Sequence, residues 1–452
     1  MGFTTVNPMD GACIQSHQYE SAAVVEKKIL SAYHAQINWE KLPILDRLQS
    51  ILNVERSLLE NQNELAHAIT SEMGKPIREA KAEIEKSARL CRYYFENALE
   101  LLPEFNYSFG KRTAQVVFQP IGVVLGIMPW NFPVWQVIRF TIPTLLMGNA
   151  VLLKHAPNVT QTALLLADLV SQGLAEANLY QSLVVDIVQV ESILAHENVQ
   201  GVSLTGSTRA GRAVAELAGR YLKKCVLELG GNDAAVVLDD ANLIDAAKKI
   251  VASRLMNSGQ SCIATKRVIA SEKIYDDIKG LILSEMMKYQ LGNPLLQETT
   301  VGPLARKDLR QHLEQQVTQM ESQGAKILYQ SSVPKEGEYY PITLIENSAA
   351  VLSDQELFGP VLQIIKANSE AEAIDVANET PFGLGASIYT GDIERGRSLA
   401  QNQLHVGSCF VNEFVKSQPE LPFGGTKQSG YGRELGLFGL LEFTNIKTVV
   451  WS

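Results

Sequence analysis

An alternation of short apolar runs with amphipathic stretches, between residues 122 and 239, is the feature that most constrains the fold of this chain. A strand buried on both faces of a sheet has a continuous apolar run, and its parallel neighbour is reached through a helical crossover. The alternation therefore predicts the α/β class, with parallel strands connected by helices. The expected strands are residues 123–128, 151–154, 183–188, 202–205 and 226–229.

A second alternation follows, because an apolar run at residues 235–238 precedes helical spacing at residues 243–257, 274–287 and 306–323. The chain has 452 residues, and single hydrophobic cores stop growing at about 250 to 300 residues. We therefore expect a second α/β domain.

Three further segments have regular patterns. Residues 45–102 have the spacing of a helical layer, which the tripeptide Gly74-Lys75-Pro76 interrupts. Residues 112–119 and 444–451 have the patterns of strands. These two strands could pair between subunits, or they could be ordinary edge strands.

Charge and composition exclude several functional classes. The chain has 40 basic and 49 acidic residues and no run rich in Lys or Arg, so nucleic acid is not an expected partner. Residues 1–19 lack the apolar core of a signal peptide, and no segment approaches the ~18 apolar residues of a membrane span. We therefore expect a cytoplasmic protein without membrane association. The five cysteines are scattered, with no CxxC pair or nearby histidine, which predicts neither disulfides nor a metal site.

Two segments carry candidate reactive groups. Cys262 ends the segment Asn-Ser-Gly-Gln-Ser-Cys, where a thiolate could attack a carbonyl carbon and backbone N–H groups could lower its pKa. The alternative is a small buried hydrophobe. Glu228 ends an apolar strand before two glycines, so burial would raise its pKa and make it a base for a thiol or a water. The alternative is a carboxylate that caps the following turn.

Two turns could bind a reacting oxyanion or a phosphate. Asn131 lies between two prolines directly after the first expected strand, which would aim its amide at the crevice where an oxyanion develops. A structural asparagine in a turn is the alternative. Gly206 and Ser207 join a strand to a helix, and free N–H groups at such a helix start suit a pyrophosphate, although a Gly-Ser turn is commonplace there.

Taken together, and in this order, these segments resemble the aldehyde dehydrogenase superfamily, most closely the short bacterial succinate-semialdehyde dehydrogenases. The resemblance covers residues 47–447 and includes Phe-Gly-Pro-Val at 358–361 and a long motif at 421–434. It implies a Rossmann-type cofactor domain, an α/β catalytic domain and a β-extension that builds a homodimer or homotetramer. The implied boundaries are residues 1–108 and 122–229 for the cofactor domain, 230–420 for the catalytic domain, and 109–121 and 440–452 for the extension.

The resemblance also implies a mechanism. Cys262 forms a thiohemiacetal whose oxyanion is held by the Asn131 side chain and the Cys262 N–H, hydride passes to the nicotinamide, and Glu228 activates the water that hydrolyses the thioester. A non-catalytic scaffold would tolerate the loss of these three residues, so their presence favours an enzyme. Ile263 and Ala264 occupy the positions where many relatives carry a second cysteine, so no disulfide switch is expected.

By the same comparison, the cofactor contacts divide into three groups: Trp130 and Lys154 on the adenosine and ribose side, Gly206 and Ser207 at the pyrophosphate, and Glu356 and Phe358 at the nicotinamide ribose. Pro157 occupies the position where a glutamate would repel a 2'-phosphate. We therefore expect NADP to be preferred, with NAD as the alternative, although proline offers the phosphate no donor.

The substrate is predicted from one helical face. Trp135 and Arg139 are four positions apart, so they share a face of the helix after Asn131. The resemblance implies that Arg139 binds the carboxylate of succinic semialdehyde, with help from Ser417. The alternatives are a structural ion pair or interface contact for Arg139, and another short or ω-carboxylated aldehyde as the substrate.

Overall fold

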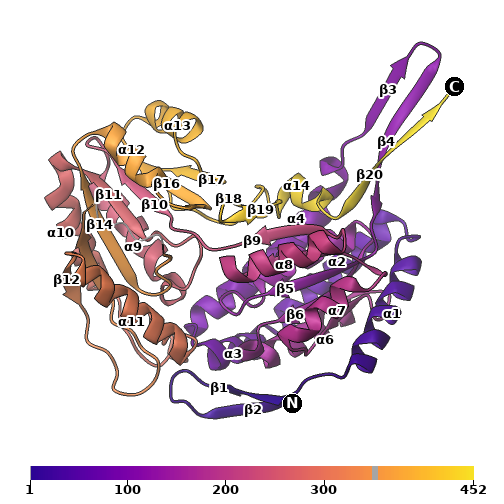
Figure 1. Cartoon of the computed structure of the whole chain (residues 1–452), viewed down its shortest axis with the longest axis horizontal. Coiled ribbons are helices and arrows are strands. Elements are labelled where there is room, and N and C mark those ends of the chain that lie inside the picture. The colour runs from indigo at the N-terminus through magenta and orange to yellow at the C-terminus, as the bar shows by residue number, and fades with distance from the viewer. Residues whose placement is uncertain (1, 349–354) are drawn as a thin grey trace.

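The computed structural model describes residues 2–348 and 355–452. It has two large open sheets, each with its own helices, and an arm of three strands that projects from the first of them (Figure 1). Both large sheets are mainly parallel, as the alternation of apolar runs and helical spacing predicts.

The first sheet has the strand order β19-β9-β8-β5-β6-β7. The strands from β9 to β7 run parallel, and the short β19 pairs antiparallel with β9. Four of the five strands expected in this region are confirmed. The strands are β5 (Val123–Met128), β6 (Ala150–His155), β7 (Tyr180–Ser182), β8 (Val199–Thr205), β9 (Lys224–Glu228) and β19 (Gly430–Tyr431).

The expected strand at residues 183–188 is wrong. The strand β7 ends at Ser182, and Asp186 then caps the 3-10 helix η2 (Ile187–Gln189) by accepting a hydrogen bond from the Ile187 N–H. Ile187 is 77% and Val188 80% exposed, so the end of this apolar run lies on the surface. An apolar run in the sequence does not by itself reveal which of its side chains are buried.

Helices cover the first sheet, and their apolar faces build the largest core. The predicted helical layer is confirmed as three helices, and Gly74 ends the second of them in the left-handed conformation, with φ 76°. The helices are α1 (Ala22–Trp39), α2 (Ile44–Glu60), α3 (Gln62–Met73), α4 (Ile77–Leu101), α5 (Trp135–Leu146), α6 (Thr160–Gly173), α7 (Val190–Ala195), α8 (Thr208–Arg220), α14 (Gly436–Leu441) and the 3-10 helix η1 (Pro157–Val159).

The second sheet has the order β12-β13-β14-β11-β10-β16-β17, parallel except for β12. Its strands are β10 (Ala234–Val237), β11 (Arg267–Ser271), β12 (Lys326–Gln330), β13 (Thr343–Asn347), β14 (Val361–Ala367), β16 (Gly385–Tyr389) and β17 (Ser408–Val411). The three expected helices are confirmed as α9, α10 and α11. The helices are α9 (Leu243–Leu255), η3 (Met256–Gly259), η4 (Glu272–Ile274), α10 (Tyr275–Met286), α11 (Lys307–Ser322), α12 (Glu370–Asn378) and α13 (Ile393–Asn402).

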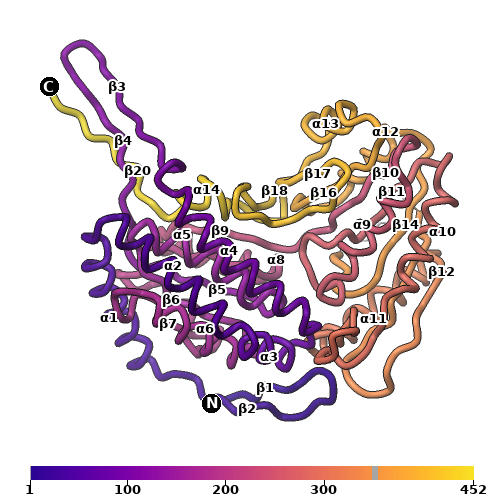
Figure 2. Tube along the Cα trace, turned by 180° about the vertical axis from the view of Figure 1, so that it is seen from behind, coloured from indigo at the N-terminus to yellow at the C-terminus, as the bar shows by residue number. Residues whose placement is uncertain are grey.

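The arm is an antiparallel sheet of β3 (Phe105–Phe109), β4 (Arg112–Pro120) and the C-terminal β20 (Thr444–Trp451). It extends away from both large sheets, as both views show (Figure 2). The two segments predicted as strands are therefore paired with each other. The sheet also includes β3, so it begins earlier than the expected start at residue 109.

Two short pairs of strands complete the chain: β1 (Gly2–Val6) with β2 (Cys13–Gln18), and β15 (Phe382–Gly383) with β18 (Thr426–Lys427). None of the helices within residues 2–348 and 355–452 combines the length and the apolar character that a membrane crossing requires.

Candidate active site

Two cavities meet at Cys262. The larger has a volume of about 780 Å³ and the smaller about 80 Å³, and Cys262 lines both. Pockets that enclose drug-sized ligands measure about 300 to 1,000 Å³. The larger cavity therefore has room for a cofactor, and the smaller one suits a short substrate.

The loop that carries Cys262 has a strained backbone. Asn257 and Ser258 adopt positive φ angles of 53° and 55°, which cost non-glycine residues about 1–3 kcal/mol each. The loop is held by an Asn257 N–H that donates to a Glu79 carboxylate oxygen at 2.6 Å, and by a Ser258 hydroxyl that donates to the Gly302 carbonyl at 3.0 Å. Such strain persists where the surrounding contacts fix the conformation, as these contacts do.

Asn131 is tied to the same loop. Its Nδ2 donates to the Gln260 carbonyl at 3.1 Å, and its own carbonyl accepts from Asn257 Nδ2 at 2.7 Å and from Lys75 Nζ at 2.8 Å. Asn131 is buried and lines the larger cavity beside Cys262. The amide and the thiol, which are far apart in sequence, are therefore fixed in one rigid cluster.

Burial raises the pKa of the Cys262 thiol to about 12, although the nearby Lys266 ammonium opposes this shift. Lys266 Nζ donates to the carbonyls of Ser261, at 2.8 Å, and Cys262, and it pairs with Glu356 Oε1 at 3.2 Å. Lys266 thus joins the thiol loop to Glu356, which also lines the larger cavity. The thiol is protonated at neutral pH, so nucleophilic attack requires a group that accepts its proton.

Glu228 ends β9 and is 2% exposed. Among the described residues neither of its carboxylate oxygens has a hydrogen-bond partner. Burial and the nearby Glu434 raise its pKa well above the ordinary value. Glu228 is absent from the described lining of both cavities. Its Oε1 lies close to Gly424, because a Cβ atom added to that glycine would be 2.7 Å from this oxygen.

Arg139 lines the smaller cavity and also forms an ion pair with Glu434, and both side chains are buried. Its Nη2 lies 3.4 Å from Thr205 Oγ1, and its guanidinium lies 4.7 Å from the Phe423 ring centroid. The structure therefore contains the ion pair that the sequence analysis gave as the alternative role of Arg139, and the same arginine also lines the cavity.

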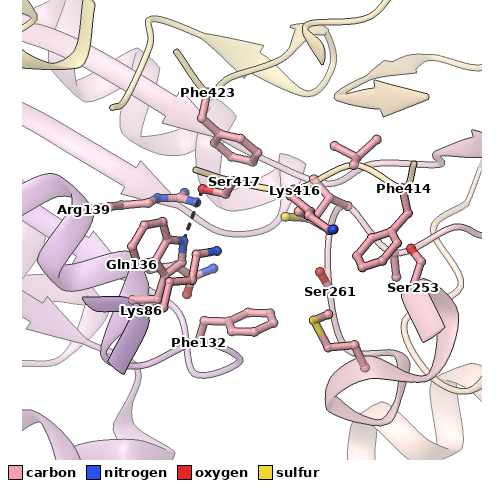
Figure 3. Close-up of a pocket in the computed structure, with 16 residues that line it drawn as sticks. Lys86, Phe132, Gln136, Arg139, Ser253, Ser261, Phe414, Lys416, Ser417 and Phe423 are labelled. Atoms are coloured by element: carbon pink, nitrogen blue, oxygen red, sulfur yellow. Dashed lines mark hydrogen bonds between the residues drawn. The ribbon is translucent and has the colours of Figure 1, made fainter. Parts of the chain in front are cut away.

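Trp135 and Ser417 lie beside Arg139. Trp135 Nε1 donates to Ser417 Oγ at 3.3 Å, and both residues line the smaller cavity. Figure 3 shows Arg139, Ser417 and Lys86 on one side of the cavity and Phe414 on the other. The three predicted substrate contacts are thus brought together, although Ser417 is distant from the other two in sequence.

The larger cavity is lined by most of the predicted cofactor residues, namely Trp130, Gly206, Ser207, Glu356 and Phe358. The Trp130 and Phe358 rings meet edge to face, with centroids 5.8 Å apart. Ser207 is the N-cap of α8, whose first turn opens into the cavity through Thr208 and Arg209. A helix start of this kind suits a pyrophosphate, so the cavity fits the dinucleotide that sequence reasoning expects.

Lys154 and Pro157 are not among the described residues that line the larger cavity. Lys154 is buried near the end of β6, and Pro157 begins η1 and borders a separate small pocket beside Phe3 and Tyr19. Within residues 2–348 and 355–452, no cluster of His, Cys, Asp and Glu side chains has the composition to hold a metal ion.

Several site residues were missed by sequence reasoning. The Lys75–Glu83 ion pair connects α4 to the Asn131 turn, because Glu83 Oε1 accepts from the Val134 and Trp135 N–H groups at 2.8 and 2.9 Å. No local pattern marks these charges as buried, and the tripeptide at residue 74 indicated only a helix break. Lys86 and Lys266 were missed for the same reason.

Comparison with known proteins agrees with this geometry. The sequence model of the aldehyde dehydrogenase family matches residues 1–449. Similar proteins include the succinate-semialdehyde dehydrogenase [NADP(+)] of Mycobacterium leprae, with 41% identity over 99% of each chain. Another is the succinate semialdehyde dehydrogenase [NAD(P)+] Sad of Escherichia coli, with 38% identity over 98% of this chain and 97% of that one. The crystal structure of succinic semialdehyde dehydrogenase from Streptococcus pyogenes in complex with NADP+ has a TM-score of 0.95 and 34% identity, over 99% of each chain.

Proposed function

The chain belongs to the aldehyde dehydrogenase family, and from that premise we propose that it oxidises succinic semialdehyde to succinate, with NADP preferred over NAD. That it is an NAD(P)-dependent aldehyde dehydrogenase follows from the family and from full-length relatives of this activity. The substrate is proposed from one observation. Arg139, Trp135 and Ser417 line a small cavity that ends at Cys262.

Cys262 is the nucleophile in this proposal. The Cys262 sulfur forms a bond to the aldehyde carbon, the carbonyl electron pair moves to oxygen, and the thiol proton passes to a base. One N–H of the Asn131 side chain and the backbone N–H of Cys262 stabilise the resulting oxyanion. When bound, the cofactor would supply the acceptor for the hydride that the thiohemiacetal carbon loses, and the carbon would remain attached to the Cys262 sulfur as a thioester.

Glu228 is the base that activates water for hydrolysis of the thioester. Burial and the nearby Glu434 raise its pKa well above the ordinary value, which makes the Glu228 carboxylate a stronger base towards water than an exposed glutamate. The carboxylate must turn from Gly424 towards Cys262 to act. Water then adds to the thioester carbon, the C–S bond breaks, and the thiol recovers a proton as the acid leaves.

Cofactor binding is proposed for the larger cavity, with Trp130, Gly206, Ser207, Glu356 and Phe358 as contacts and Lys154 nearby. Preference for NADP is supported by the absence of a carboxylate at Pro157 and by the NADP(+) in the names of similar proteins. The first sheet with its helices would hold the cofactor, and the second would carry Cys262.

A second candidate substrate is a short aldehyde without a carboxylate, or with a carboxylate at another distance. The Arg139–Glu434 ion pair favours this alternative, because Glu434 already compensates the charge of Arg139. The small volume of the cavity limits either substrate to a short chain.

We also propose that the arm joins subunits into a homodimer or homotetramer. Its strands expose large apolar side chains, which single soluble chains rarely gather in one place. These side chains are Phe105, Tyr107, Phe109, Ile446, Val449, Val450 and Trp451. Sedimentation of the wild type and of a Val450→Asp variant tests this, since a monomeric wild type would contradict it.

The function is tested by kcat/KM for succinic semialdehyde, glutaric semialdehyde, butanal and benzaldehyde, each with NAD and with NADP. The absorbance of the reduced cofactor is the readout. We expect succinic semialdehyde with NADP to be preferred. Comparable values for neutral aldehydes would retain the dehydrogenase and reject the carboxylate substrate.

A further inference from the structure

We propose that Lys86 binds the distal carboxylate of the aldehyde substrate and so determines specificity. This inference rests on the proposed function, since it names the charged group that recognises a carboxylated aldehyde. Lys86 lies on α4, outside the segments that carry the sequence motifs, and it lines the same small cavity as Cys262.

The position of Lys86 is fixed by the contact between α4 and α5. Glu83, on the preceding turn of α4, accepts hydrogen bonds from the N–H groups of Val134 and Trp135 at the start of α5. The Lys86 ammonium lies 4.0 Å from the centroid of the Trp135 ring. The ammonium therefore lies on the same side of the cavity as Arg139 and Ser417 (Figure 3).

Three basic residues line this cavity, and they differ in whether their charge is compensated. Arg139 pairs with Glu434, and Lys416 pairs with Glu413 at 3.0 Å. For Lys86, the described part of the chain provides no carboxylate within ion-pair distance; its close contact is the Trp135 ring.

Glu83, the acidic residue one turn before Lys86 on α4, already has other partners. Glu83 forms an ion pair with Lys75 and accepts the two α5 N–H groups, so its charge is shared among three donors. A half-buried ammonium without a carboxylate is unfavourable in the free protein. Burial and the Arg139 charge accordingly lower the pKa of Lys86 to about 7.

A bound substrate carboxylate would compensate the charge of the half-buried Lys86 ammonium. It would form a charge-assisted hydrogen bond with Lys86, while Arg139 and the Ser417 hydroxyl could provide further donors. A neutral aldehyde would leave the ammonium uncompensated. The difference between the two cases is the proposed basis of specificity, and it identifies the substrate class as short aldehydes with a terminal carboxylate.

The test compares Lys86→Met with wild type. Methionine retains an apolar stem beside Trp135 and removes the charge. We expect kcat/KM for succinic semialdehyde to fall about 10- to 100-fold, mainly through KM. The kcat/KM for butanal should change less than about threefold. Lys86→Arg keeps the positive charge, so it should retain most of the wild-type kcat/KM for succinic semialdehyde.

Lys81→Met is the matched control, because Lys81 lies on the same helix and is not among the described residues that line the cavity. It should leave both substrates unaffected. Equal losses for both aldehydes in Lys86→Met, or no loss, would overturn the inference. If Lys86→Met does not fold, the ratio of kcat/KM for succinic semialdehyde to that for butanal is measured for Lys86→Gln instead, and the same outcomes support or overturn the inference.

Inhibition by succinate separates the two proposals. Succinate should inhibit butanal oxidation by the wild type, and its inhibition constant should rise about 10-fold or more in Lys86→Met. A wild type that ignores succinate and does not prefer succinic semialdehyde would reject the proposed function. A preference for succinic semialdehyde that persists in Lys86→Met would reject only the role of Lys86 and would leave the proposed function in place.

Discussion

Arg139 forms a buried ion pair with Glu434, and the same arginine lines the smaller cavity beside Cys262. Glu434 also lies 3.3 Å from the Ser203 hydroxyl, so the pair is anchored to β8. The arginine that sequence reasoning assigned to the substrate therefore has a structural partner as well. Its two roles can be separated by experiment.

Arg139→Met should destabilise the fold by about 3–5 kcal/mol, because it leaves the Glu434 carboxylate buried without a partner. The double variant Arg139→Met/Glu434→Gln should recover much of this loss. Urea unfolding measures both. A single variant as stable as wild type would mean that the pair contributes nothing to folding and that Arg139 serves the substrate alone.

Selectivity should depend on pH through Lys86. The ammonium must be protonated to bind a carboxylate, and its pKa is about 7 because burial, Arg139, Arg89 and Lys75 lower it while Glu83 opposes them. The ratio of kcat/KM for succinic semialdehyde to that for butanal should therefore be highest below pH 7 and fall as pH rises towards 9. In Lys86→Arg the ratio should stay level, since arginine remains charged. A level ratio in wild type would contradict this prediction.

Alkylation of Cys262 should accelerate steeply with pH. Because the pKa of the buried thiol is about 12, its thiolate fraction rises about tenfold per pH unit between pH 7 and 9. Mass spectrometry after treatment with iodoacetamide follows the rate, and the exposed Cys13 provides an internal comparison. A plateau below pH 9 would show that the thiol ionises more readily than its burial implies.

Glu228→Gln should allow one turnover and then stall. Acylation would release about one equivalent of reduced cofactor per site, and the steady state would fall about 10²- to 10⁴-fold without a base for the water. Stopped-flow absorbance separates the two phases. Cys262→Ala should show neither phase, and a steady state of wild-type rate in Glu228→Gln would remove Glu228 from the mechanism.

Pro157→Glu should reduce kcat/KM with NADP about 10-fold or more and leave NAD nearly unchanged, because a carboxylate near the adenosine ribose repels a 2'-phosphate. Initial rates with both cofactors provide the ratio. Pro157 borders a pocket separate from the larger cavity, so an unchanged ratio would show that its distance from the cofactor is too great.

Most strands of the first sheet, the helical layer at residues 45–102 and the positions of the motifs could be predicted from the amino-acid sequence. The strand β5 is a continuous apolar run because both of its faces are covered, and the helix α4 has a local period of 3.6 residues because one of its faces is buried; both patterns depend only on which side chains face a core. The segment around Cys262 and the turn at Asn131 were likewise identified from neighbouring residues. The local pattern was misleading at residues 183–188, where the apolar side chains of η2 are exposed.

The pairing of the buried charges could not be predicted from the sequence, because it depends on the tertiary structure. Glu434 could face any of several cations, and packing places it against Arg139, which leaves Lys86 as the basic group of the cavity without a carboxylate among the described residues. In the same way Lys266 joins the Cys262 loop to Glu356. Coulomb interactions and desolvation depend on distance and burial in space, and no spacing along the chain encodes which distant residue becomes a neighbour.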